Sequence, residues 1–369
     1  MSTKIRHITL TVLSGFAVVL VLYLIQGNRA PERHGFTRAF QHDVLGQPAV
    51  LDLGFNSYYI AGIDSTSLYF GNSTAARRIL KSDLKLQDTS HHIIQYGDTT
   101  TYPFRSIRVE VLPPYFYYAD GTIPVIKRGS SEDWRITETY SPKTYFDLYK
   151  VIDTTKFILR SLHADTDEIR LHLFDRDTLA TRALHHLATG PGWGIFGMDG
   201  RLSVDSESDH IFYQFYYWNA LLVLDTALHV ENQWASLDSI TAPQIKTETI
   251  RSSGETTMAA PPLKVNNQAQ VDGRWLFVQS ALMGQQENPV SFNGSVVIDV
   301  YDWHNGHYVF SFYLPNYGGK PSREYRIHEG QLISLHDTYA VAYPIANDYF
   351  NSRDTTKLLA NNQGNAENL

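Results

Sequence analysis

The stretch that decides the fold is Ile63-Asp64-Ser65-Thr66-Ser67-Leu68-Tyr69-Phe70, in which an apolar residue and an aspartate precede polar residues and an apolar strand. The pattern returns at residues 152–159, 204–213, 271–278 and 336–341, and residues 109–118 repeat it with Leu112 in place of the aspartate. Strand–turn–strand units at intervals of roughly 40–67 residues are typical of β-propellers. The sequence therefore predicts an all-β, six-bladed β-propeller, with seven blades as the alternative count.

The composition suits such a fold and excludes several classes of function. The chain has 369 residues, of which 43% are hydrophobic, and its 23 Tyr and 18 Phe suit strands that are buried on both faces. The net charge is −7, so the chain lacks the excess of basic residues that is typical of nucleic-acid-binding proteins. Because the chain has no cysteine, it forms no disulfide, zinc–thiolate site or thiol nucleophile.

The N-terminus carries one long apolar run. Residues 8–25 contain no charge, and Lys4 and Arg6 precede them. Eighteen residues that rise about 1.5 Å each just cross a hydrocarbon core of about 30 Å. Residues 1–26 are therefore predicted to be a signal anchor with a transmembrane helix, and a cleaved signal peptide is the alternative. This places the protein in the inner membrane as a single-pass protein, with the propeller in the periplasm.

The remaining boundaries follow from composition. Residues 27–47 are polar with mixed charge and are predicted to be a tether, and residues 48–359 are predicted to be the propeller. A strand at residues 48–53 is expected to pair with the final unit, residues 325–359, and so to close the ring. The Asn-rich residues 360–369 are predicted to be a disordered tail.

A candidate site emerges when the units are aligned on the recurring aspartate. The positions six residues before it hold a polar set, namely Tyr58, Ser106, Asp147, Asp199, Asn266 and Gln331. Two residues further along, on the same strand face, lie Arg108 and Arg201. Because the innermost strands of a propeller line its central tunnel, these eight residues are the predicted ligand-binding set at the tunnel mouth.

Two kinds of chemistry fit this set. The oxygens of Asp147, Asp199 and Asn266 are ligands of the kind that calcium prefers. In the second kind, Arg108 and Arg201 pair with the carboxylates of Asp147 and Asp199 or bind an anionic ligand. A third interpretation stays open, in which the residues are polar only because the tunnel is filled with water.

Several segments resemble an uncharacterised family of membrane-tethered proteins from Bacteroidota. They are residues 51–62 (LDLGFNSYYIAG), residues 68–72 (LYFGN) and residues 113–118 (PPYFYY). The wider resemblance, to six-bladed propellers in general, covers about residues 48–359. It implies the propeller fold but no defined active site. Propeller enzymes of the lactonase kind hold a central calcium with Glu, Asn and Asp, and this chain offers Asp and Asn but no Glu at the mouth-facing positions.

The predicted function is a membrane-anchored extracytoplasmic propeller that acts as a protein- or ligand-binding platform in the cell envelope. No cofactor is predicted, and an enzymatic activity is left undecided because no catalytic constellation is recognisable. The alternative is a calcium-dependent hydrolase or lyase with its site at the tunnel mouth. The predicted partners are the membrane, through residues 8–25, and a protein whose identity the sequence does not reveal.

Overall fold

The structure is a computed structural model of the chain. It describes residues 3–27, 31–96, 102–163, 168–184, 187, 193–205, 207–252, 254–346 and 350. The tail predicted at residues 360–369 lies outside these residues, as do residues 351–359 of the final unit.

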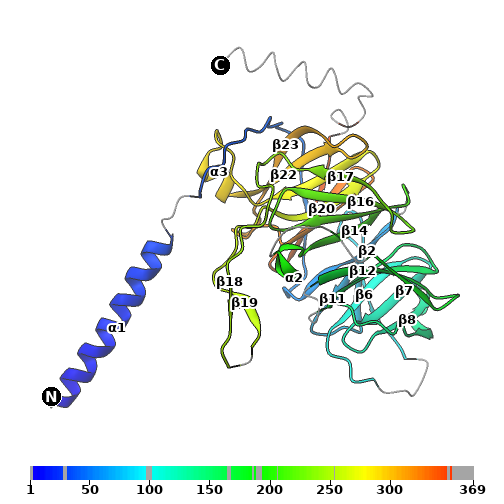
Figure 1. Cartoon of the computed structure of the whole chain (residues 1–369), viewed down its shortest axis with the longest axis horizontal. Coiled ribbons are helices and arrows are strands. Elements are labelled where there is room, and N and C mark those ends of the chain that lie inside the picture. The colour runs from blue at the N-terminus through cyan, green and yellow to red at the C-terminus, as the bar shows by residue number, and fades with distance from the viewer. Residues whose placement is uncertain are drawn as a thin grey trace, which may run out of the picture.

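Within the described residues the strands form six four-stranded antiparallel sheets and one separate hairpin (Figure 1). The first sheet contains β2 (Tyr58–Ile63), β3 (Ser67–Asn72), β4 (Arg78–Asp83) and β5 (Thr89–Ile93). The second contains β6 (Ile107–Leu112), β7 (Tyr115–Asp120), β8 (Val125–Ser130) and β9 (Arg135–Tyr140). The third contains β10 (Leu148–Val151), β11 (Lys156–His163), β12 (Glu168–Asp175) and β13 (Ala180–Leu184).

The remaining sheets follow the same order along the chain. The fourth contains β14 (Gly200–Asp205), β15 (His210–Phe215), β16 (Ala220–Asp225) and β17 (Val230–Ala235). The fifth contains β20 (Asn266–Asp272), β21 (Trp275–Ser280), β22 (Ser295–Asp302) and β23 (His307–Pro315). The sixth contains β24 (Glu324–His328), β25 (Gln331–His336), β26 (Tyr339–Pro344) and, as its outer strand, β1 (Ala49–Asp52). The connecting segments form short helices α2 (Gly194–Gly197) and α3 (Pro289–Asn293) and the hairpin of β18 (Thr247–Thr249) and β19 (Thr256–Met258).

The ring is closed by strands from the two ends of the domain. β1 pairs antiparallel with β26, with Ala49 opposite Ala342 and Asp52 opposite Tyr339. The predicted pairing of residues 48–53 with the final unit is therefore confirmed. The innermost strands also complete a circle, because β2 contacts β6, β6 contacts β10, β10 contacts β14, β14 contacts β20, β20 contacts β24, and β24 contacts β2.

The core lies between neighbouring sheets rather than inside one of them. One cluster, for example, joins Tyr117 of the second sheet to Phe157 and Phe174 of the third, and all three are fully buried. The backbones also approach closely near the axis. A Cβ atom at Gly62 would lie 2.1 Å from the carbonyl oxygen of Val111 on the neighbouring innermost strand, so only glycine fits there.

The aspartate of the recurring pattern shapes the turn between the first two strands of a sheet. Asp64 Oδ1 accepts hydrogen bonds from the backbone N–H groups of Thr66 and Ser67. Asp153 Oδ1 accepts the equivalent bonds from Thr155 and Lys156. These aspartates therefore form the turns that define the repeat, as the local chemistry of aspartate favours.

Part of the segment predicted to be a tether is docked on the propeller. Bridges join Arg33 to Met283, Phe40 to Ser311 and Leu45 to Ile345, so the chain runs along the fifth and sixth sheets. Phe40 stacks on Tyr313 with ring centroids 4.3 Å apart. We call residues 31–47 the N-terminal strap.

The strap is held by a buried charge cluster. The Arg38 guanidinium donates to Asp299 Oδ1 at 2.7 Å and to Asp299 Oδ2 at 3.1 Å, and it also pairs with Glu287. The side chains of Arg38, Glu287 and Asp299 are at most 3% exposed. The N-terminal strap is therefore fixed to the propeller, although its sequence is polar. The reason is that the charge of Arg38 is buried between Glu287 and Asp299.

Helix α1 (Thr3–Gly27) precedes the strap and projects from the propeller (Figure 1). Its described apolar side chains, among them Leu10 and Phe16, are exposed. Among the residues that the structure describes, no helix combines the length and apolar character needed to cross a membrane. The predicted transmembrane helix is therefore not supported.

Candidate ligand-binding site at the propeller axis

A cavity of about 550 Å³ lies at the axis, where the innermost strands meet. Its wall is built by β2, β6, β10, β14 and β24 and by the segments that lead into them. We call it the axial cavity. Its volume lies within the range of about 300–1,000 Å³ that is usual for small-molecule sites.

Positive charge predominates in the wall of the axial cavity. Its charged residues are Arg108, Arg201, Arg323, Arg326 and Lys150 against Glu110, Asp147 and Glu324. The wall therefore carries five cationic side chains and three carboxylates. This excess contrasts with the net charge of −7 of the whole chain.

Two of the three carboxylates are already bound to cations of the protein. Asp147 accepts from Arg160 Nε at 3.0 Å, and the same guanidinium reaches Asp199 Oδ1 at 2.7 Å. Arg160 is a residue of β11 and is buried, so it joins the third sheet to the fourth. Glu110 pairs with Lys150 and also accepts the backbone N–H of Val151 at 2.9 Å.

The third carboxylate, Glu324, is only loosely engaged with the arginines. Its Oε1 lies 4.0 Å from Arg201 Nη2, and its Oε2 accepts the backbone N–H of Ile60 at 3.3 Å. Arg326 donates to Gln270 Oε1 at 2.8 Å, which is a neutral partner. The guanidinium groups of Arg201 and Arg326 thus keep donors for a ligand, since each has five N–H bonds.

Aromatic rings give the cavity an apolar wall as well. The Arg108 guanidinium lies over the Tyr59 ring, 4.5 Å from its centroid, in a cation–π contact. The Tyr59 hydroxyl accepts the backbone N–H of Val109 at 2.7 Å. Burial raises the pKa of Tyr59 to about 12, so the hydroxyl is neutral at physiological pH.

Lys150 has an unusual electrostatic setting. Burial lowers its pKa from the ordinary value, Arg326 and Arg201 lower it further, and Glu110 opposes them. The balance leaves the pKa of Lys150 below the ordinary value for a lysine. A cation in this place is disfavoured first because it is buried and then because other cations line the same cavity.

The structure brings together five of the eight residues in the predicted set. The residues of the set that line the axial cavity are Tyr58, Ser106, Arg108, Asp147 and Arg201. Asp199 does not line it, but Asp199 and Asp147 accept hydrogen bonds from the same Arg160 guanidinium. The residues that the alignment missed are Glu110, Lys150, Arg160, Arg323, Glu324 and Arg326.

Gln331 does not lie where the alignment placed it. It belongs to β25, the second strand of the sixth sheet, and it does not line the axial cavity. The alignment used His336-Asp337, which is the turn between the second and third strands. The equivalent turn between the first two strands is Glu329-Gly330, and using it would have pointed to the strand that carries Glu324 and Arg326.

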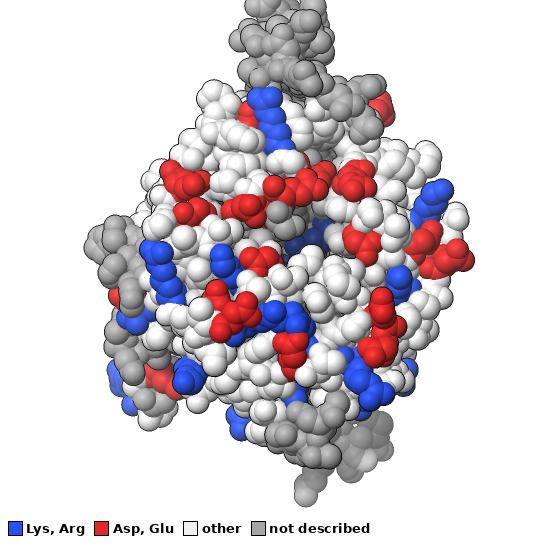
Figure 2. Space-filling view, turned by 90° about the vertical axis from the view of Figure 1, so that its right-hand side faces the viewer, with Lys and Arg blue, Asp and Glu red and all other residues white. Residues whose placement is uncertain are grey.

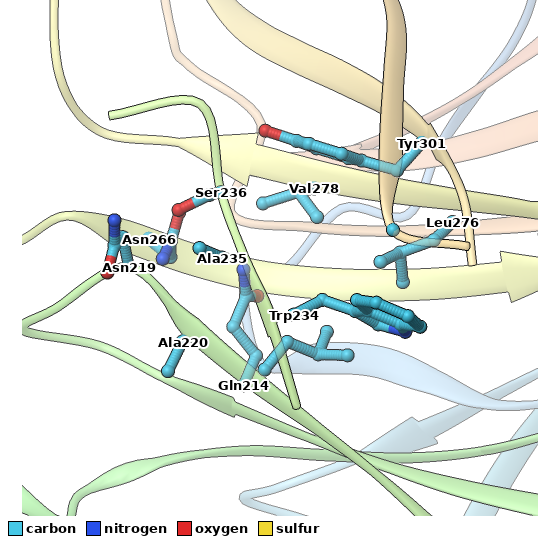
Figure 3. A pocket seen from close by; sticks show the side chains of 12 residues that line it. Gln214, Asn219, Ala220, Trp234, Ala235, Ser236, Asn266, Leu276, Val278 and Tyr301 are labelled. Atoms are coloured by element: carbon cyan, nitrogen blue, oxygen red, sulfur yellow. The ribbon is translucent and has the colours of Figure 1, made fainter. Parts of the chain in front are cut away.

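Asn266 lines a different and much smaller pocket, between the fourth and fifth sheets. Figure 3 shows its amide beside Asn219 and Ser236, with Leu276, Val278 and Tyr301 on another side. The Asn266 amide donates to the backbone carbonyl of Trp218 at 3.3 Å. At about 10 Å³ this pocket has room for a water molecule but for no organic ligand.

The predicted calcium ligands are consequently not assembled into one site. Asp147 and Asp199 converge on the Arg160 guanidinium, whereas Asn266 belongs to the small pocket between sheets. Across the residues that the structure describes, no group of three or more His, Cys, Asp or Glu is arranged to hold a metal ion. The carboxylates instead neutralise Arg160, whereas the predicted pairing was with Arg108 and Arg201.

On one face of the propeller, the charge at the centre differs from the charge around it. Figure 2 shows the face that points away from α2, α3 and the β18–β19 hairpin. A hollow opens near the centre of that face, with basic side chains at its bottom and acidic side chains around it. The turns between first and second strands, which carry Asp64, Asp153, Asp205 and Asp272, contribute acidic residues at this end of the sheets. On this face, basic side chains therefore lie in the central hollow and acidic side chains lie around it.

These features define the chain as a six-bladed β-propeller with a cationic cavity at its axis. A crystal structure of a member of the DUF4221 family from Bacteroides vulgatus is similar, with a TM-score of 0.50 and 11% identity over 85% of this chain and 99% of that chain. A protein from Bacteroides fragilis, described as a candidate exported protein, has a TM-score of 0.51 and 9% identity over 85% of this chain and 99% of that chain. No protein-family model and no curated protein matches the sequence. At this level of identity the likeness shows the shared fold.

Proposed function

We propose that this protein is a binding platform whose axial cavity receives an anionic ligand, such as an acidic saccharide of the cell envelope. The observation that carries the proposal is the surplus of guanidinium groups in a cavity whose carboxylates Asp147 and Glu110 are already neutralised. Guanidinium groups bind carboxylates and phosphates through paired, charge-assisted hydrogen bonds. The aromatic wall around Tyr59 adds the apolar surface that most small-molecule sites contain.

The first prediction concerns Arg201, whose ion pair with Glu324 is long, at 4.0 Å. Arg201→Ala is expected to weaken the binding of an oligogalacturonate by about tenfold or more, because a hydrogen bond to a charged group contributes about 1.5–3 kcal/mol. Isothermal titration calorimetry of the full chain measures this, with a neutral glucose oligomer of the same length as the reference ligand. Binding of the acidic oligomer is also expected to weaken as salt is added.

Two further variants make the test specific. Glu324→Gln removes the loosely held carboxylate and is expected to strengthen binding of the acidic oligomer. Arg251→Ala removes the same charge from an exposed position near the β18–β19 hairpin, and it should leave the affinity unchanged. Equal binding of the acidic and neutral oligomers, or equal losses in the Arg201 and Arg251 variants, would refute the proposal.

We further propose that the protein resides in the inner membrane with its propeller in the periplasm, attached through α1. The support is the run of exposed apolar side chains on that helix, which would be covered by lipid. A chain lacking residues 1–27 is expected to be recovered in the supernatant after alkaline carbonate extraction of membranes, whereas the full chain stays in the pellet. Recovery of both chains in the supernatant would contradict the attachment. Protease digestion of spheroplasts is expected to remove the propeller, and its survival would contradict the periplasmic placement.

A further inference from the structure

We propose that Lys150 forms an imine with a carbonyl-bearing anion, of the 2-oxo acid class, that is bound in the axial cavity. This inference rests on the proposed anion-binding function and adds a covalent step to it. It assigns a chemical role to a side chain that recognition of an anion alone does not require.

The position of Lys150 is suited to this role. It lies on β10, the innermost strand of the third sheet, and it lines the axial cavity with a side chain that is 20% exposed. Its ammonium group pairs with Glu110. Glu110 is itself oriented by the backbone N–H of Val151, so its carboxylate stays beside the amine.

Burial favours the neutral amine of Lys150, which is the nucleophilic form of lysine, whereas the carboxylate of Glu110 opposes this. Burial lowers the pKa of Lys150 most, and Arg326 and Arg201, from β24 and β14, lower it further. The same two guanidinium groups are the expected binding site for the carboxylate of the ligand. A 2-oxo acid carries its carbonyl carbon directly beside the carboxylate, so a ligand held by these arginines presents that carbon near Lys150.

The step balances with Glu110 as the proton carrier. Glu110 takes a proton from the Lys150 ammonium, and the free amine adds to the carbonyl carbon to give a carbinolamine, whose hydroxyl receives the second amine proton. Glu110 then returns its proton to that hydroxyl, which leaves as water while the C=N bond forms. The products are one protonated imine and one water molecule, and no oxidant or reductant takes part.

The test is reductive trapping on the full chain. The protein is incubated with pyruvate and sodium cyanoborohydride, and intact-mass and peptide mass spectrometry then locate the reduced adduct. The expected result is one adduct per chain on Lys150, formed faster than on any other lysine. Lys150→Arg should abolish that adduct, and Lys246→Arg, at an exposed position, should not change it.

Two additional measurements separate the covalent step from anion binding. Calorimetry with pyruvate and with lactate, which has the same carboxylate but no carbonyl group, reports binding in the cavity independently of trapping. Glu110→Gln is expected to slow adduct formation and to shift its pH profile, although lactate should bind at least as tightly because one carboxylate of the cavity wall has lost its charge. If both acids bind but adducts are spread over the surface lysines and persist in Lys150→Arg, the imine is refuted and the anion site stands. If neither acid binds and no adduct forms on Lys150, the imine is refuted, and the calorimetry with the acidic oligomer decides the anion site separately.

Discussion

Arg38→Ala is expected to lower the free energy of unfolding by about 3–5 kcal/mol, because it leaves two buried carboxylates without their counter-ion. Asp299 and Glu287 are 2% and 3% exposed at the side chain, so water cannot replace the guanidinium. Burial by itself would lower the pKa of Arg38, but Asp299 and Glu287 outweigh it and raise that pKa further above its usual range. Arg38 therefore remains charged wherever the protein is folded.

Urea unfolding, followed by circular dichroism, measures this loss. Arg33→Ala is the matched control, since Arg33 lies on the same strap, is exposed, and donates one hydrogen bond to the Gln285 carbonyl. It should change the stability by no more than about 0.5 kcal/mol. Adding Glu287→Gln to Arg38→Ala should restore part of the loss by removing one buried charge. A loss below about 1 kcal/mol for Arg38→Ala would mean that the strap is not held by this cluster.

Phe157→Ala is expected to destabilise the protein by about 3–5 kcal/mol, the range for removing a large buried aromatic side chain. Phe157 is fully buried between sheets, with its ring 5.2 Å from that of Tyr117 and 6.0 Å from that of Phe174. Its loss leaves a cavity at the contact between the second and third sheets. Among the residues that the structure describes, this cluster draws only on the second and third sheets and the segment between them, so no third sheet contributes side chains to fill the cavity.

Thermal and urea unfolding of three variants test the packing argument. Phe157→Leu keeps most of the apolar volume and should lose less than about 1.5 kcal/mol. Phe55→Ala removes the same side chain from a position that is 67% exposed, and it should change the stability by no more than about 0.5 kcal/mol. Similar losses for Phe157→Ala and Phe55→Ala would contradict the assignment of the core to the space between sheets.

Most of the architecture could be predicted because it depends on local chemistry that repeats. An aspartate at the turn, such as Asp64 or Asp153, marks the passage from a first to a second strand in four of the six sheets. The sixth unit misled the alignment because its first turn is Glu329-Gly330, while an aspartate, Asp337, occupies the next turn. A one-turn slip moved the predicted residue to Gln331 and away from Arg323, which lies six residues before Glu329 and lines the axial cavity.

The strap and the site depended on contacts that no local pattern contains. Arg38 lies more than 240 residues from each of its partners Glu287 and Asp299, so its polar neighbourhood in the sequence indicated a tether. The alignment placed Asp147 and Asp199 near the axis, where the structure also has them. Their partner Arg160, which donates hydrogen bonds to both carboxylates, lies on a second strand, and the alignment covered first strands only.

The sequence by itself determined the repeat, the closure by residues 48–53 and the absence of cysteine chemistry, because each follows from residue type and spacing along the chain. Only the tertiary structure decided which charges are free. Ring closure brings Arg201 and Arg326 to the same cavity as Lys150, and whether a charge there is neutralised depends on partners from other sheets, such as Arg160 for Asp147. The physical reason is that charge pairing is decided by distances of a few ångströms across the axis, which spacing along the chain does not encode.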